Sequence, residues 1–248
     1  MINSQLINIM LVDDHDMILK GVRGLLETQT AFRVVAEATG EEDALLKANE
    51  FHKANKLHEA NGPEALHLVV TDLEMPHVKM PRGTINGIQL TKKLLFRFPA
   101  LRVLVYTYHD EEKYIFQAIE AGAWGFVTKG AESAGLLIEA TRRIVNGHKV
   151  FPPVLKPEEH LTPTERQVLW LLGDGKSNAY IAAKLRETSI TKRTVEKHRS
   201  NIWDKLKEYL SEEDSENPTV LINIATRYRD RCPFPIIIDT KMKDGSSH

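Results

Sequence analysis

Five short apolar runs divide the first 147 residues into a repeating pattern, and this pattern limits the possible folds more than any other feature of the chain. Each run has three to six residues, most of them apolar, and is followed by apolar residues at helical spacing. Alternating strands and helices fold into a parallel sheet with helices on both faces. We therefore expect strands at residues 7–12, 34–36, 66–70, 103–106 and 126–128, and helices around residues 18–26, 44–51, 88–95, 114–121 and 136–145.

Charged or hydroxyl side chains stand at the ends of four of these strands. Asp13 and Asp14 follow the first strand, Asp72 the third, Thr107 the fourth and Lys129 the fifth. In open α/β sheets, sites form at the carboxyl ends of the strands. Because three crowded carboxylates repel one another unless a divalent cation binds, the sequence predicts a magnesium site. Such a site prepares one carboxylate to attack a phosphoryl group, with the lysine and the hydroxyl stabilising the transferred group.

Three motifs at these strand ends resemble the receiver domain of two-component response regulators. They are LVDDH at residues 11–15, VTDLEMP at 70–76 and AGAWGFVTK at 121–129, with Thr107 at the intervening strand end. Each motif alone is weakly specific, but their joint occurrence in the correct order is highly specific. The resemblance covers most of residues 6–147 and implies a five-stranded, parallel, doubly wound α/β fold of the flavodoxin-like type.

The resemblance also implies a role for each site residue. Asp72 accepts a phosphoryl group from a sensor histidine kinase, and Lys129 stabilises it. Thr107 and Phe126 form a switch pair, in which the aromatic ring turns inward when the threonine moves to the phosphoryl group. The implied magnesium ligands are Asp13, Asp14, Asp72 and the main-chain carbonyl of Glu74.

A phosphatase of the haloacid dehalogenase type is the enzymatic alternative, because it also uses an aspartate nucleophile at a strand end. Such an enzyme requires a second aspartate two residues further on, and Glu74 occupies that position. We therefore expect a phosphoryl acceptor and not an enzyme. Glu74 and His109 lie beside the site and are candidates for tuning the access of water.

Beyond residue 148 the pattern changes to a proline-containing segment and then to helices alone. Prolines 152, 153 and 157 indicate a fairly stiff linker at residues 149–160. Thr162-Pro163-Thr164-Glu165 is typical of a capping box with proline at the first helical position. Further helices are expected at residues 179–185, after Thr191, and after Asn217-Pro218. The predicted domains are a receiver at 1–148, a helical domain at 161–231 and a tail at 232–248.

The helical segment resembles the small all-α, helix-turn-helix DNA-binding domain of the NarL/LuxR type. The resemblance covers about residues 158–228 and rests on LTPTERQVL at 161–169, Ser177-Asn178 with Ile181-Ala182, and TVEKHRSNI at 194–202 with Lys205-Leu206. It implies a recognition helix that enters the major groove. The candidate DNA-contacting residues are Lys192, Arg193, Thr194, Glu196, Lys197, Arg199, Ser200, Asn201 and Lys205.

The role of Glu196 stays open at this point. A glutamate on a recognition helix can accept a hydrogen bond from cytosine, or it can pair with a neighbouring lysine. Without the motif, the whole segment would more simply be a solvated amphipathic helix. The net charge of −1 gives no overall signal for nucleic acid, so any DNA-binding face must be local.

Four segments depart from the two family patterns by being longer. They are residues 40–66, residues 76–87 beside Asp72, the turn at 186–189 before the recognition helix, and the acidic loop at 207–217. Each is either a tolerated surface insertion or a segment that changes phosphate lifetime, kinase contact or DNA contact.

The sequence thus predicts a cytoplasmic transcription factor whose DNA binding is controlled by phosphorylation. We expect a homodimer on repeated half-sites of promoter DNA, with a sensor histidine kinase as the other partner. The N-terminus lacks a signal peptide, no apolar run is long enough to span a membrane, and the single Cys232 excludes an intrachain disulfide. The alternative within the same family is a regulator that binds DNA independently of phosphorylation.

Overall fold

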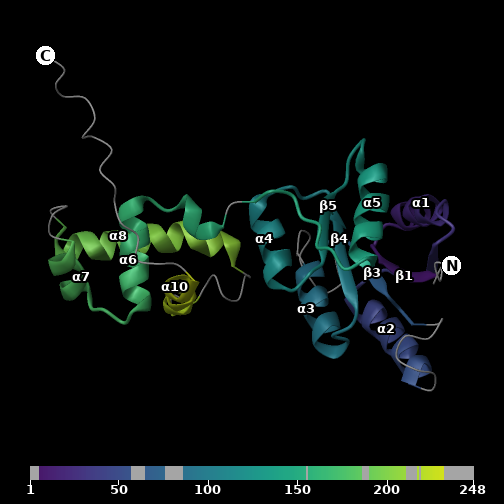
Figure 1. Ribbon diagram of the computed structural model, residues 1–248, viewed down its shortest axis with the longest axis horizontal. Coiled ribbons are helices and arrows are strands. Elements are labelled where there is room, and N and C mark those ends of the chain that lie inside the picture. Colours follow the sequence, from purple (N-terminus) through teal and green to yellow (C-terminus); the bar gives the residue numbers. More distant parts are fainter. Residues whose placement is uncertain are drawn as a thin grey trace, which may run out of the picture. The chain divides into compact units, whose positions relative to one another are not determined.

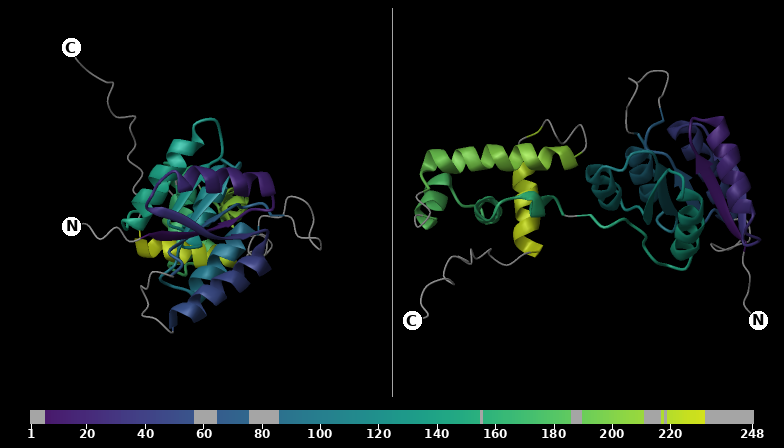
Figure 2. Two further views of the ribbon diagram at one scale, coloured as in Figure 1. Left: turned by 90° about the vertical axis from the view of Figure 1, so that its right-hand side faces the viewer. Right: turned by 90° about the horizontal axis from the view of Figure 1, so that it is seen from above.

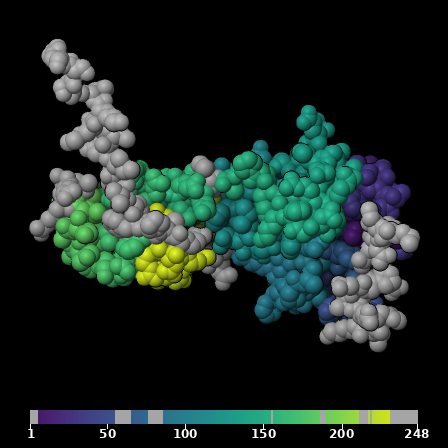
Figure 3. All heavy atoms as spheres, viewed as in Figure 1, coloured from purple at the N-terminus to yellow at the C-terminus, as the bar shows by residue number. Residues whose placement is uncertain are grey.

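The computed structural model describes residues 6–56, 65–75, 86–154, 156–185, 190–210, 217 and 219–231. Contacts within the chain divide it into two compact units, Met1–Val154 and Leu155–His248, and each is described by itself. In the space-filling view, purple to teal atoms belong to the first unit and green to yellow atoms to the second (Figure 3).

The first unit is built on a five-stranded sheet. Its strands are β1 (Ile7–Val12), β2 (Phe32–Ala38), β3 (Leu68–Thr71), β4 (Arg102–Thr107) and β5 (Gly125–Thr128). They lie in the order β2-β1-β3-β4-β5, and every neighbouring pair is parallel. This is the flavodoxin-like order, so the predicted fold class is confirmed.

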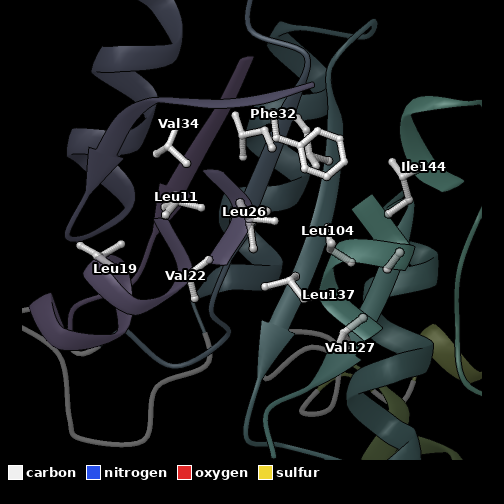
Figure 4. Close-up of a cluster of buried hydrophobic side chains, with 14 residues drawn as sticks. Leu11, Leu19, Val22, Leu26, Phe32, Val34, Leu104, Val127, Leu137 and Ile144 are labelled. Atoms are coloured by element: carbon white, nitrogen blue, oxygen red, sulfur yellow. The ribbon is translucent and has the colours of Figure 1, made fainter. Parts of the chain in front are cut away.

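Five helices cover the two faces of the sheet (Figures 1 and 2). Helices α1 (Asp16–Glu27) and α5 (Ser133–Val145) pack on one face, and α2 (Glu41–Lys56), α3 (Gly87–Arg97) and α4 (Glu112–Glu120) on the other. Figure 4 shows the α1–α5 side, where Leu26 and Leu137 meet Leu11 and Leu104 of the strands. Each of these leucines is at most 1% exposed, and burial of such a side chain contributes about 1.5–3 kcal/mol.

Glycines end α4 and α5. Gly122 and Gly147 have φ angles of 89° and 88°, a left-handed conformation that other residues adopt only with strain. After α5 the chain returns to the sheet, because Val150 N donates a hydrogen bond to Trp124 O and Val150 O accepts one from Phe126 N, each at 2.9 Å. Residues 150–154 of the segment predicted as a linker therefore lie against the first unit.

The second unit contains helices and no strand among its described residues. Its elements are η1 (Pro157–His160), α6 (Pro163–Gly173), α7 (Asn178–Lys184), α8 (Lys192–Leu206), η3 (Lys207–Tyr209) and α10 (Val220–Arg231). The predicted capping box is present, since Thr162 Oγ1 accepts from Glu165 N and Glu165 Oε2 accepts from Thr162 N. Residues of α6, α7, α8 and α10 share one buried apolar cluster.

Several predictions concern segments outside the described residues. These are most of the loops at 76–87 and 207–217, the turn at 186–189, the tail at 232–248 and part of the segment 40–66. Within 40–66, α2 extends to Lys56, beyond the helix expected at residues 44–51. No helix in the described part of the chain has the length and apolar character needed to cross a membrane.

Candidate functional site

Strand register brings the predicted acidic residues together. Val12 of β1 is paired with Thr71 of β3, so Asp13 and Asp72 leave the sheet side by side. The Asp72 N–H donates to Val12 O at 2.9 Å, which fixes the backbone between the two aspartates. A cavity of about 520 Å³ opens at this edge of the sheet, and its lining residues are Asp14, His15, Ile18, Asp72, Glu74, Thr107, Tyr108 and His109.

Lys129 links the two buried aspartates. Its Nζ lies 2.7 Å from Asp13 Oδ2 and 2.8 Å from Asp72 Oδ2, and its side chain is 3% exposed. Burial by itself lowers the lysine pKa, but the two carboxylates outweigh it and the pKa is raised. Lys129 therefore remains charged at neutral pH. Its backbone N–H donates to Thr107 O at 2.6 Å, which holds the ends of β5 and β4 together.

Asp13, Asp14 and His15 form a group that fits a divalent cation. Their ligand atoms all lie within 4.8 Å of one another. Asp14 Oδ1 is buried and accepts no hydrogen bond from any described residue, although His15 Nδ1 is 2.9 Å away. Burial raises the pKa of Asp14 and the charges of Asp13 and Asp72 add to this, whereas His15 lowers it. A bound cation would neutralise the buried negative charge and would coordinate Asp14 Oδ1. The neighbouring carboxylate oxygens are ligands that suit magnesium.

The side chains that could hold a metal ion include one that the sequence analysis did not name. His15 was not predicted, although it directly follows the two aspartates in the sequence. Asp72 Oδ1 accepts from Leu73 N at 2.6 Å and Oδ2 pairs with Lys129, so both of its oxygens are engaged within the chain. Among the described residues, the side chains grouped with Asp13 and Asp14 do not include that of Asp72. Magnesium binding by Asp72 and by the main-chain carbonyl of Glu74 stays a prediction.

Asn86 and Gly87 anchor the chain beside Asp72, and the sequence analysis missed both roles. The Asn86 side chain accepts from Met75 N at 3.2 Å and donates to Met75 O at 2.5 Å. Gly87 lies so close to β3 that a Cβ on it would be 2.1 Å from the Asp72 carbonyl oxygen. These contacts hold Met75 and Asn86 together beside Asp72. The only sequence signal was an Asn-Gly pair at the start of a helix.

The two predicted switch residues are both buried. Thr107 and Phe126 are each 1% exposed, and Phe126 packs in the cluster formed by α3, α4, β4 and β5. The ring thus occupies the inward position, and the predicted movement stays a prediction. At the cavity edge, His109 Nε2 lies 3.2 Å from Glu74 Oε2, so these two side chains face each other across the site as neighbours of Asp72 and Thr107.

Helix α8 of the second unit has one buried face and one exposed face. It begins after Thr191, as the sequence predicts, and Thr191 caps it by accepting from Thr194 N at 3.1 Å. Val195, Ile202 and Leu206 are buried in the domain core. On the opposite side lies a stripe of exposed residues at spacings of three, four, seven and eleven, which we call the outer face: Arg193, Glu196, Lys197, Ser200 and Asp204.

Three of the candidate DNA-contacting residues are engaged within the second unit. Arg199 Nη1 donates to Asn178 Oδ1 of α7 at 3.0 Å, and Lys205 Nζ donates to Glu165 Oε2 at 2.7 Å. Thr194 Oγ1 lies 2.8 Å from Thr191 Oγ1. The remaining candidates are exposed, apart from the half-buried Asn201: Lys192, Arg193, Glu196, Lys197 and Ser200.

Comparison with known protein families gives two matches that together span most of the chain. Residues 9–141 match the response regulator receiver domain. Residues 159–208 match the luxR family of bacterial regulatory proteins.

Individual relatives are similar over nearly their whole length. The transcriptional regulatory protein DegU of Brevibacillus brevis is 29% identical over 83% of this chain and 89% of its own. The response regulator protein VraR of Staphylococcus aureus is 30% identical, over 81% of this chain and 90% of its own.

Solved structures of the RcsB response regulator are also similar. One from Salmonella typhimurium has a TM-score of 0.55 at 26% identity, covering 90% of this chain and 99% of that one. A structure of RcsB from Salmonella enterica serovar Typhimurium bound to a promoter, in the presence of a phosphomimetic, has a TM-score of 0.50 at 26% identity. It covers 89% of this chain and 98% of its own.

Proposed function

Since the chain belongs to the response regulators, with a receiver domain followed by a LuxR-type DNA-binding domain, we propose that phosphorylation of Asp72 controls its binding to promoter DNA. The observation that carries the proposal is the buried triad of Asp13, Asp72 and Lys129, of which Asp72 lines an open cavity. We place the receiver at residues 1–148 and the DNA-binding domain at 161–231, joined by the segment 149–160.

Asp72 is the phosphoryl acceptor in this proposal. A carboxylate oxygen forms the new bond to phosphorus while the bond from phosphorus to the histidine nitrogen of the kinase breaks, and the freed imidazole takes up a proton from solvent. Lys129 already lies 2.8 Å from Asp72 Oδ2 and is positioned to pair with an oxygen of the transferred group. Thr107, at the end of the neighbouring strand β4, supplies a hydroxyl on another side of the cavity.

Asp13 and Asp14 hold magnesium in this proposal, together with Asp72 and the Glu74 carbonyl. The support is the buried oxygen of Asp14, which accepts no hydrogen bond within the described part of the chain, and the raised pKa of that carboxyl. Bound magnesium neutralises the charge that builds up on the phosphoryl group during transfer. The chain's own contribution is to hold the two strand ends in register, so that the acidic side chains converge.

The added charge then acts on the second domain through Thr107 and Phe126. RcsB binds promoter DNA in the presence of a phosphomimetic, and two RcsB dimers occupy two parallel DNAs in another structure. By analogy, we propose that this chain binds repeated half-sites as a homodimer in the cytoplasm, with a sensor histidine kinase as its phosphoryl donor. It accepts one phosphoryl group and does not turn over a substrate.

Replacing Asp72 by asparagine tests the proposal. Wild-type protein incubated with acetyl phosphate and magnesium should gain one phosphoryl group by intact-protein mass spectrometry, and Asp72→Asn should gain none. Asp43→Asn is the matched control, because Asp43 is an acid on α2 that pairs with Lys47 and lies outside the cavity. Undiminished incorporation in Asp72→Asn would exclude the proposed acceptor, and equal DNA affinity of wild type with and without the donor would favour the phosphorylation-independent alternative.

A further inference from the structure

Residues 150–154, which we call the strap, lie along the outer edge of β5. Since β5 is the last strand of the sheet, its inner edge pairs with β4 and its outer edge with no other strand of the described residues. Val150 pairs with this outer edge in parallel orientation, opposite Gly125. Its N–H donates to Trp124 O and its carbonyl accepts from Phe126 N, each at 2.9 Å. The strap thus shares two hydrogen bonds with the strand that carries the predicted switch residue.

Side chains of the strap also pack against the surroundings of Phe126. Phe151 and Val154 are half-buried against the apolar cluster of α3, α4, β4 and β5, to which the buried Phe126 ring belongs. Gly125 allows the close approach, because a Cβ on it would lie 2.9 Å from Val150 O. The strap is therefore held by the main chain of Phe126 and by the cluster that its ring fills.

This hold is short, so the strap can open without the rest of the unit. Pro152 and Pro153 have no N–H to donate, and the pairing with β5 is limited to Val150. The hydrogen bonds of Val150 and the two half-buried side chains must offset the entropy of ordering the strap. Segments held in this way open locally while the rest of a domain stays folded. The docked and the open strap are thus two states whose populations a small free energy shifts.

We propose that docking of the strap on β5 is coupled to phosphorylation of Asp72, so that the phosphoryl group closes the strap. The inference rests on the proposed function of Asp72. Lys129 directly follows β5, and its Nζ lies 2.8 Å from Asp72 Oδ2. Its backbone N–H donates to Thr107 O at the end of the neighbouring strand. Because β5 has only 4 residues, the acidic site at its carboxyl end and the strap along its outer edge share one short, rigid element.

The conformation of Phe126 sets the direction of this coupling. Its ring is 1% exposed and points inward, and the strap is docked in the same structure. An outward ring would leave a cavity in the cluster that supports Phe151 and Val154, and such cavities are destabilising. A phosphoryl group that draws Thr107 and Lys129 toward itself would hold β5 and the inward ring in place. By linkage, docking of the strap then favours binding at the site by the same factor.

Amide exchange and ligand affinity test the coupling in the full-length chain, with beryllofluoride and magnesium as the phosphoryl mimic. In wild type, the mimic should slow exchange of the Val150 and Phe126 amides by about 5-fold or more, measured by NMR. The control is the Phe32 amide, which donates to Gln29 O on the strand at the opposite edge of the sheet and should slow less. Phe151→Ala removes part of the apolar hold and should weaken binding of the mimic by a similar factor in isothermal titration calorimetry.

Two further variants complete the test. Phe96→Ala is the matched control, because Phe96 is a phenylalanine of α3 that is 88% exposed, and it should bind the mimic as wild type does. Val154→Ala deletes less of the strap than Phe151→Ala and should weaken binding to a smaller degree, which keeps the test decisive if the larger change unfolds the unit.

The outcomes separate the inference from the function on which it rests. Wild-type affinity for the mimic in both strap variants, or equal slowing of the Val150, Phe126 and Phe32 amides, would overturn the inference alone. Failure of the folded wild type to bind beryllofluoride would overturn the proposed phosphorylation of Asp72 and the inference with it.

Discussion

The acidic cavity of the first unit and the outer face of α8 in the second unit both depend on charged side chains, but they hold them in opposite ways. Beside the cavity, Asp13 and Asp72 are buried and each is paired with the buried Lys129. On the outer face, Glu196 and Lys197 are exposed and form no ion pair among the described residues. The first arrangement completes its charge pairing within the chain, and the second leaves that pairing to a ligand.

This difference has an energetic consequence. Removing one member of a buried charged group leaves its partners without compensation in a poorly solvated environment, which is strongly destabilising. Removing an exposed charge changes folding stability little, because water already solvates it. Substitutions in the cavity should therefore act first on stability, and substitutions on the outer face should act on DNA affinity alone.

The largest effect is expected from Lys129→Met. The change leaves two buried carboxylates without their cation and should lower the unfolding free energy of the first unit by about 3–5 kcal/mol in a metal chelator. Added magnesium should restore part of the loss by replacing the positive charge. Hydrogen exchange of peptides from β1 and β3 measures the change. Lys20→Met is the control, because Lys20 pairs with Asp16 on the surface, and equal protection in the two variants would contradict the comparison.

A smaller loss is expected from Gly87→Ala. Its Cβ would lie 2.1 Å from the Asp72 carbonyl oxygen, so the backbone must move, at a cost of about 1–3 kcal/mol or more. Phosphoryl incorporation at Asp72 should fall at the same time. Gly21→Ala is the control, because Gly21 is an exposed residue of helix α1 and its added methyl group would have no neighbouring atom within 4 Å among the described residues. The unfolding free energy of Gly21→Ala should rise by about 0.5–1 kcal/mol. If urea denaturation gave Gly87→Ala the same unfolding free energy as wild type, the close approach of Gly87 to Asp72 would not be required.

The smallest effects are expected from substitutions of two lysines of α8, Lys205 and Lys197. Lys205→Met should lower the stability of the second unit by about 1 kcal/mol or less, because Lys205 is partly exposed and pairs with the buried Glu165. Lys197→Met should leave stability unchanged but weaken binding to all DNA sequences, and should reduce the salt dependence by about one counterion. Equal effects of the two substitutions on affinity would contradict the division of α8 into engaged and outer residues.

The Lys205 contribution should also depend on pH. Burial raises the pKa of Glu165, but hydrogen bonds from Lys205 and Thr162 outweigh it, and the pKa is lowered below the usual glutamate range. A lowered folded-state pKa contributes stability that is present above the unfolded pKa and is lost as the pH falls through the folded pKa. The difference in melting temperature between wild type and Lys205→Met should therefore shrink on acidification. A constant difference would show that the ion pair is not its source.

Local features of both units could be predicted from the sequence. Three such features are the apolar periodicity of the strands, the capping box at Thr162 and the end of α4 at Gly122. Each depends on neighbouring residues, and each is present. The convergence of Asp13, Asp72 and Lys129 on one sheet edge was also predictable, because parallel strands share a carboxyl end.

Side-chain partners distant in sequence were decided by the tertiary structure alone. Gly87 owes its importance to the carbonyl of Asp72, and Arg199 is held by Asn178 of another helix. Helical spacing shows which residues of α8 face outward, but it does not show which of them find partners on a neighbouring helix. The sequence by itself determined the periodicities and the residue types at the ends of the strands, since these depend on local spacing. Only the packing of distant segments decided which charges are paired within the chain and which are left for a ligand.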